Sequence, residues 1–144
     1  MAVKPIPEGY HTVTPSLSLK GAAKFIDFAK AAFGAEEAFR MPLPNGDIMH
    51  AEVRIGDSTL MVHDAMGQPP TISALFLYVK DVDALYKRAV SAGATSAAAP
   101  ADMFWGDRVA QVTDQFGNHW SIATHTEDVA PDEVEKRARA AMKQ

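Results

Sequence analysis

The feature that most constrains the fold is an internal repeat, in which two halves of the chain share motifs at an offset of about 60 residues. Ala32-Phe33-Gly34-Ala35 matches Ser91-Ala92-Gly93-Ala94, and Ile55-Gly56-Asp57 matches Phe116-Gly117-Asn118. A solenoid needs three or more copies, whereas two copies of this length favour a pseudo-symmetric pair of supersecondary units. The 144 residues of the chain are enough for both units within one domain.

The first half begins with two segments of different hydrophobic period. Residues 12–19 alternate between apolar and hydroxyl side chains, which predicts a strand with one buried face, and Pro15 indicates an edge or a bend. Residues 21–33 carry an apolar stripe at helical spacing, and Gly34 predicts a left-handed cap at the end of that helix.

Three further strands are predicted to complete the first half. Residues 36–41 and 48–55 flank Asn45-Gly46, a pair that supplies the two positive φ angles of a tight hairpin turn. Gly56-Asp57 then turns the chain into a strand over residues 58–63. The order of elements in this half is therefore β-α-β-β-β.

The same order restarts after a linker over residues 66–71, which contains Gly67, Pro69 and Pro70. We predict strands over 75–79, 95–99, 109–113 and 120–125, a helix over 82–92 capped by Gly93, and a loop over 103–108. Trp120 alternates with Ser121 and is expected to face the helix, in the core.

The predicted fold class is α+β, with two βαβββ modules and a C-terminal helix. The modules cover about 10–65 and 72–126 of a single domain over residues 1–130, and a helical tail covers 131–144. Pro131 suits a first helical position, and acidic residues precede basic ones in the tail, as the helix dipole favours. A ferredoxin-like domain is the alternative, because single βαβββ pieces resemble it.

Composition excludes several classes of function. The chain has no cysteine, so disulfides, thiolate nucleophiles and cysteine-ligated metals are excluded. The formal charge of −4 argues against a nucleic-acid footprint, and no apolar run is long enough to span a membrane. Residues 1–5 lack the apolar stretch of a signal peptide, and we therefore expect a cytoplasmic protein.

An ordered set of short motifs resembles one known family. The chain is similar to the PhnB-like branch of the glyoxalase, bleomycin-resistance and extradiol-dioxygenase group, the vicinal-oxygen-chelate superfamily. The motifs run in this order: Tyr10-His11-Thr12-Val13-Thr14-Pro15, Ile26-Asp27-Phe28, Ala32-Phe33-Gly34-Ala35-Glu36, His50-Ala51-Glu52, Ile55-Gly56-Asp57-Ser58, Val79-Lys80-Asp81-Val82-Asp83-Ala84, Gly106-Asp107-Arg108 and Ile122-Ala123-Thr124-His125.

This resemblance implies paired βαβββ modules whose curved sheets enclose a cavity, usually in a homodimer. It does not fix a reaction, because the group includes isomerases, dioxygenases, thiol transferases, epimerases and non-catalytic drug binders. It also implies a small-molecule ligand as the partner, while charge and hydropathy argue against nucleic acid and a membrane as partners.

Metal-dependent members of the group place one His, Gln or Glu ligand on the first and last strand of each module. In this sequence the four positions fall on Thr14, Met61, Ala74 and Ser121, and none of these is a good ligand. We therefore predict no cofactor with the usual ligands, and a divalent metal only at a relocated site.

His50 and Glu52 are the candidate catalytic residues, because period two places an imidazole and a carboxylate on one strand face. Such a pair acts as acid and base, or holds a displaced metal. The competing interpretation is a hydrogen bond within a polar lining.

Six further residues are candidates for ligand binding. Phe76 and Tyr78 share a strand face, and Trp105 can stack on a flat ligand while Arg108 pairs with a carboxylate or phosphate. His63 either contacts a ligand or caps a turn together with Asp64. The six are His63, Phe76, Tyr78, Trp105, Arg108 and Ser121.

Alternatives stay open for the residues around the loop. Phe104 and Trp105 are equally suited to packing beneath a lid, and Arg108 to an ion pair with Asp107 or Asp114. His11 is expected at the surface or at a strand edge, with the cavity mouth across a dimer as the alternative. Two functions are compatible with the sequence: action on a small metabolite in the sheet cavity, or sequestration of a ligand by a non-catalytic dimer of the bleomycin-resistance type.

Overall fold

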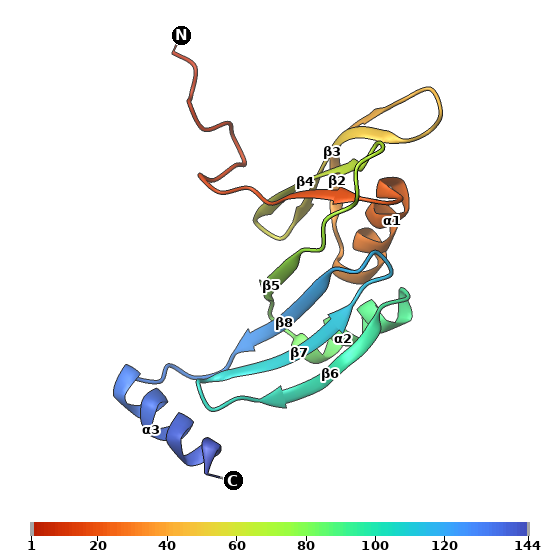
Figure 1. The fold of residues 1–144 in the computed structure, drawn as a ribbon. Helices are drawn as coiled ribbons and strands as arrows, with labels where there is room; N and C mark the ends of the chain where they lie inside the picture. The colour runs from red at the N-terminus through yellow and green to blue at the C-terminus, as the bar shows by residue number, and fades with distance from the viewer. Residues whose placement is uncertain (1, 144) are drawn as a thin grey trace. The chain divides into compact units, whose positions relative to one another are not determined.

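The computed structural model of the chain describes residues 2–143. Met1 and Gln144, the first residue of the predicted domain and the last of the predicted tail, lie outside the described residues. The chain divides after Ser73 into two compact units, and each contains the predicted β-α-β-β-β order (Figure 1). The predicted α+β class with two such modules and a C-terminal helix is confirmed.

The first unit is a four-stranded sheet with one helix against it. The strands follow the order β1-β4-β3-β2, in which β1 is parallel to β4 and the other neighbours are antiparallel. The elements are β1 (Ser16–Leu19), α1 (Ala22–Phe33), β2 (Glu36–Pro42), β3 (Ile48–Ile55) and β4 (Ser58–Asp64).

The second unit repeats this topology and adds a helix at its end. Its strand order is β5-β8-β7-β6, again with one parallel pair between the first and last strands. The elements are β5 (Ala74–Tyr78), α2 (Val82–Ser91), β6 (Thr95–Asp102), β7 (Asp107–Thr113), β8 (His119–His125) and α3 (Pro131–Met142). Within residues 2–143, no helix has the length and apolar character needed to cross a membrane.

Each sheet has a helix face and an open face, as the alternation in the sequence predicts. In the first unit the predicted apolar stripe of α1 is buried, together with Phe28. In the second unit Trp120 is buried at 1% exposure, so its predicted place in the core is confirmed. The side chains left on the open faces are those that alternate with these core residues, and they include most of the candidate site residues.

Several predicted boundaries are wrong by one to four residues. The first strand begins at Ser16 instead of residue 12; Pro15 lacks an N–H for the ladder, although its carbonyl accepts from the Met61 N–H at 2.9 Å. The strand predicted over 95–99 continues to Asp102, because β6 is an edge strand that tolerates its internal proline. Ala92 is the C-cap of α2, and Gly93 follows it with a φ of 113°.

A further boundary concerns the loop predicted over 103–108, because Asp107 and Arg108 already belong to β7. Asp107 lies opposite His125, and Arg108 lies opposite Thr124. The loop sequence is polar and aromatic at this point and shows no apolar alternation, which is why the strand start was missed.

The hairpin turn at Asn45-Gly46 also differs from the prediction. Gly46 has a φ of 92°, but Asn45 is not among the residues with positive φ. The Gly46 N–H donates to the Leu43 carbonyl at 2.9 Å, and the Leu43 N–H donates to the Asp47 carbonyl at 2.7 Å. This is the three-residue hairpin loop, in which only the final glycine needs a positive φ. The second unit repeats it between Met103 and Asp107, with Gly106 at the same place.

Asp64 joins three elements of the first unit through one buried carboxylate. It accepts from the Gly21 and Ala22 N–H groups at 2.9 Å each and from the Ile48 N–H at 2.6 Å. The first two are orphan donors at the start of α1, whose own N-cap residue, Gly21, has no side chain to serve them. Asp64 therefore caps a helix from a distant strand, where the sequence indicated a turn cap.

Candidate functional site

A cavity of about 580 Å³ lies on the open face of the first sheet. Seven of its lining residues come from the segment over residues 5–14, which we call the N-terminal strap. The other three are His50 and Glu52 from β3 and Met61 from β4. The cavity is thus walled on one side by sheet residues that alternate with the core, and on the other by a segment without regular secondary structure.

The N-terminal strap is held to the sheet at defined points. The Thr59 hydroxyl donates to the Gly9 carbonyl at 2.9 Å, and the Pro15 carbonyl accepts from β4 just beyond the strap. Within the strap, the Tyr10 N–H donates to the Pro7 carbonyl at 3.1 Å. Two prolines and these anchors restrict the conformations that the strap can adopt.

His50 and Glu52 lie together in the cavity wall, as their spacing predicts. His50 Nε2 is 3.5 Å from Glu52 Oε2, and both side chains are partly exposed. The Phe39 ring also lies beside the imidazole, with ring centroids 6.1 Å apart. Since Glu52 lies opposite Met61 in the β3–β4 register, a polar pair and an apolar side chain meet in the same part of the wall.

Tyr10 is a lining residue that the sequence did not identify, and His11 also lines the cavity. His11 is exposed, as expected, and it reaches the cavity from the strap of its own chain. Tyr10 Oη is buried and has no hydrogen-bond partner among the described residues. Neither residue lies in a periodic segment, so their position depends on how the strap crosses the sheet.

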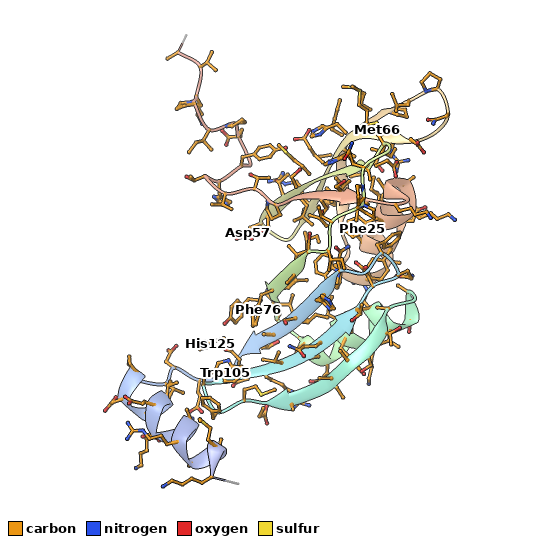
Figure 2. The ribbon with its side chains drawn as sticks, in the orientation of Figure 1. Phe25, Asp57, Met66, Phe76, Trp105 and His125 are labelled. Atoms are coloured by element: carbon orange, nitrogen blue, oxygen red, sulfur yellow. The ribbon has the colours of Figure 1, made fainter. Side chains whose placement is uncertain are left out.

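A second cluster lies on the open face of the second sheet, around the Asp107 carboxylate. Asp107 is 2% exposed and accepts from three side chains. Tyr78 Oη and Trp105 Nε1 donate to Oδ2 at 2.8 and 2.9 Å, and His125 Nδ1 lies 2.8 Å from Oδ1. Figure 2 labels Trp105 and His125, which lie at the same end of this sheet.

The charges of this cluster stabilise one another. Burial raises the pKa of the Asp107 carboxyl, but the hydrogen bonds from His125, Tyr78 and Trp105 outweigh it and hold that pKa below its ordinary value. The hydrogen bond to Asp107, and then that to Asp128, raises the pKa of His125. The same carboxylate raises the pKa of the Tyr78 phenol. Relative to the isolated groups, these contacts favour the ionised form of the Asp107 carboxyl and the protonated form of the His125 imidazole.

Arg108 points away from this cluster. Its guanidinium binds Asp83 of α2 through two hydrogen bonds of 2.9 and 3.1 Å, and Asp102 at 3.3 Å. These hydrogen bonds raise its pKa further above the ordinary value. The predicted ion pair with Asp107 or Asp114 is wrong, because alternation along β7 turns Arg108 toward the helix.

The remaining candidates lie on the open faces but outside these contacts. The Phe76 ring is 5.1 Å from the Tyr78 ring, and Ser121 accepts a long hydrogen bond of 3.5 Å from Gln111. His63 follows Met61 on the open face of β4 and is not among the cavity-lining residues. Trp105 packs edge-on against Phe104, at 5.0 Å between centroids.

The chain shares these features of sequence and fold with a known group of proteins. The sequence model described as the Glyoxalase/Bleomycin resistance protein/Dioxygenase superfamily matches residues 11–122, which cover most of both repeats. The chain belongs to this superfamily.

Relatives and solved structures agree with the assignment. An uncharacterized protein of Mycobacterium bovis is 38% identical over 135 residues, covering 85% of this chain and 89% of its own. The crystal structure of TioX from Micromonospora sp. ML1 has 27% identity and a TM-score of 0.65, covering 78% of this chain and 98% of that one. A superfamily enzyme from Burkholderia phytofirmans PsJN has 20% identity and a TM-score of 0.63, covering 76% and 94%, and supports the fold alone.

The residues at the superfamily's usual ligand positions do not fit a metal ion. Thr14 and Met61 line the cavity of the first unit, and Ala74 and Ser121 lie on β5 and β8 of the second. A thioether, a methyl group and two hydroxyls do not form the imidazole and carboxylate set that divalent metals in this group need. Over residues 2–143, no three His, Asp or Glu side chains gather as metal ligands would.

Proposed function

We propose that the chain binds a small organic molecule in the cavity between the N-terminal strap and the first sheet. The observation that carries this proposal is the cavity itself, whose volume of about 580 Å³ falls in the range typical of ligand pockets. Pro5, Ile6, Pro7 and Met61 give it an apolar lining. The polar groups in the lining, such as His50 and Glu52, are of the kind that orients a ligand in a mainly apolar pocket.

Binding without chemistry is the primary proposal, and acid–base catalysis is the second. The His50–Glu52 contact in the wall favours the second, because a carboxylate that orients an imidazole prepares it as a general base. The four unsuitable metal positions favour the first. A divalent metal at a relocated site stays a prediction; calorimetric titration of chelator-treated protein with Zn²⁺ and Mn²⁺, beside H50A, tests it.

Several finer assignments are proposals of their own, and the further residues among them do not line the cavity of the first unit. The ordered motifs support membership of the PhnB-like branch, and the resemblance to bleomycin-resistance proteins supports a homodimer. A cytoplasmic location stays a prediction. His63, Phe76, Tyr78, Trp105, Arg108 and Ser121 stay predicted ligand-binding residues. Sedimentation of the purified protein tests the dimer directly.

Filling the cavity will abolish ligand binding. M61W places an indole where the ligand would lie, and we expect it to weaken binding of any compound found in a thermal-shift screen of metabolites by more than tenfold. M49W is the matched control, because Met49 lies on β3, is 49% exposed and does not line the cavity. Calorimetry on both variants gives the dissociation constants, and hits that bind M61W as tightly as the wild type would contradict the proposal.

Substitution of His50 will separate the two functions. If the protein only binds, H50Q will change the dissociation constant of a confirmed hit by a few-fold and no product will form with either variant. If the pair catalyses, the wild type will convert the hit, and H50Q will lose turnover by about 10²–10⁴-fold with little change in affinity. NMR spectra of the hit, recorded over hours with each protein, show which case holds.

A further inference from the structure

The imidazole of His125 lies between two carboxylates of very different character. Its Nδ1 faces the buried Asp107, and its Nε2 is 2.7 Å from Asp128 Oδ1. The Asp128 side chain is fully exposed to solvent, and among the described residues His125 is its only side-chain partner. The contact with Asp107 is thus part of the buried structure. The contact with Asp128 joins the same imidazole to a carboxylate that is exposed to solvent.

The fixed part of the cluster does not depend on Asp128. Asp107 is held by Tyr78 and Trp105 as well as by His125, so the orientation of the imidazole is set from within the sheet. An oriented imidazole with a raised pKa presents one N–H donor, at Nε2, toward the open face. That donor is suited to an anion.

Aromatic surface adjoins this donor. Tyr78 and Trp105 both donate to the same oxygen of Asp107, which places their rings beside the His125 site. Phe76 extends the surface along β5, and it is 51% exposed while Tyr78 is 64% exposed. Exposed rings of this size favour stacking with a flat ligand.

From this arrangement we infer that the open face of the second sheet binds a flat aromatic carboxylate. The carboxylate of the ligand replaces Asp128 at His125 Nε2, and its ring packs on Phe76 and Tyr78. Asp128 occupies the anion position in the free protein and competes with the ligand for it. This site is separate in residues from the cavity of the first unit and does not depend on the function proposed for that cavity.

His125, not Arg108, is the anion contact in this site. Arg108 is a predicted anion anchor by residue type, but Asp83 and Asp102 already occupy its guanidinium on the helix side. Asp107 balances a positive charge on His125 from within the sheet. Within the described part of the chain, the outer nitrogen contacts one carboxylate, that of the exposed Asp128.

The segment that carries Asp128 remains anchored when that side chain is removed. The Gly106 carbonyl accepts from the Thr126 N–H at 2.8 Å and from the Glu127 N–H at 3.1 Å. Arg137 of α3 donates to the Phe104 carbonyl at 3.2 Å and pairs with Glu127 at 2.6 Å. D128A therefore removes the competing carboxylate and leaves the backbone in place.

The test is an NMR titration of the isotope-labelled full-length protein with 2-naphthoate and with its uncharged analogue 2-naphthamide. We expect 2-naphthoate to shift the Trp105 indole N–H signal saturably, and D128A to bind it about tenfold more tightly than the wild type. The amide will bind at least tenfold more weakly than the acid. H125Q will lose the preference for the acid, whereas H119Q, at an exposed position on the same face of β8, will keep it.

Three outcomes would overturn the inference. One is equal affinity of the acid and the amide for the wild type, and another is an unchanged dissociation constant in D128A. The third is a set of shifts confined to Thr14 and Met61, which would place the compound in the cavity of the first unit. Retention of the Trp105 indole signal in H125Q shows that this variant is folded. A loss of its preference for 2-naphthoate over 2-naphthamide then reports on the binding site.

Discussion

Replacement of Asp64 by alanine will lower the free energy of unfolding by about 3 kcal/mol. The carboxylate accepts from three backbone N–H groups, at the start of α1 and at the first residue of β3. Ala22 and Ile48 are buried, so water does not replace the lost acceptor without opening the structure. An unpaired buried donor retains its full desolvation cost, which is why the loss exceeds that of an ordinary hydrogen bond.

Urea denaturation followed by circular dichroism measures this loss. D57A is the control, because Asp57 is an exposed acidic residue in the β3–β4 turn. Among residues 2–143, its side chain accepts one hydrogen bond, from the Ser58 hydroxyl. We expect D57A to change the unfolding free energy by less than about 0.5 kcal/mol. Equal midpoints for D64A and D57A would show that the carboxylate does not join the three elements.

The contribution of Asp64 will depend on pH with a defined sign. Burial raises its pKa, but the hydrogen bonds from Ile48, Ala22 and Gly21 lower it more, so the folded-state pKa lies below the ordinary value of about 3.9. The stabilisation is therefore complete above that value and disappears as the pH falls through the folded-state pKa. The difference in unfolding free energy between the wild type and D64N should be constant near neutral pH and shrink in acid; a gap that widened in acid would contradict this assignment.

The repeats and the periodicity of the sequence predict most of the architecture. A helix with an apolar stripe buries that stripe by packing on a sheet, and alternation along each strand determines which strand residues face the helix. His50 and Glu52 were therefore placed correctly on one face, and Trp120 in the core. These predictions concern residues within one helix or strand, where the spacing along the sequence determines which side chains share a face.

The contacts that sequence reasoning missed depend on register between elements. Asp107 meets His125 only because β7 begins two residues earlier than its apolar pattern indicates. Extending the alternation of β7 back by two residues from Val109 would have placed Asp107 on the open face. Arg108 then turns to α2, and its partner Asp83 lies on an element whose orientation the sequence does not specify.

The N-terminal strap was missed for a different reason. Residues 5–11 have no period and no apolar face, so no local pattern indicates where they lie. Their position follows from anchors such as the Thr59 hydroxyl bond to Gly9, a single contact between residues distant in sequence. As a result, His50 and Glu52 were identified as candidates, while the cavity wall opposite them was not.

Alanine at Gly106 will destabilise the protein far more than alanine at Gly46, although the two glycines end the same kind of hairpin loop. Both have positive φ angles, 100° and 92°, which cost an alanine about 1–2 kcal/mol. A Cβ at Gly46 would meet nothing within 4 Å, so we expect G46A to lose only that amount. At Gly106 the added Cβ would overlap the carbonyl oxygen of Glu127 and crowd the side chain of Val129 at 3.1 Å.

The obstacle at Gly106 is backbone, which has no alternative rotamer to adopt. Relief of the overlap must move the segment after β8 away from the hairpin, and this weakens the hydrogen bonds that Thr126 and Glu127 donate to the Gly106 carbonyl. Overpacking of this kind costs about 1–3 kcal/mol beyond the φ penalty, so we expect a total loss of about 3 kcal/mol for G106A.

Parallel urea titrations of G46A and G106A measure the difference directly, because the shared turn geometry cancels in the comparison. The Trp105 indole signal should also move in G106A and stay in place in G46A, since Trp105 precedes the glycine and its hydrogen bond to Asp107 spans the loop. Equal destabilisation by the two substitutions would mean that the segment after β8 yields without cost. In that case the anchoring of Asp128 beside His125 would be weaker than the hydrogen bonds to Gly106 indicate.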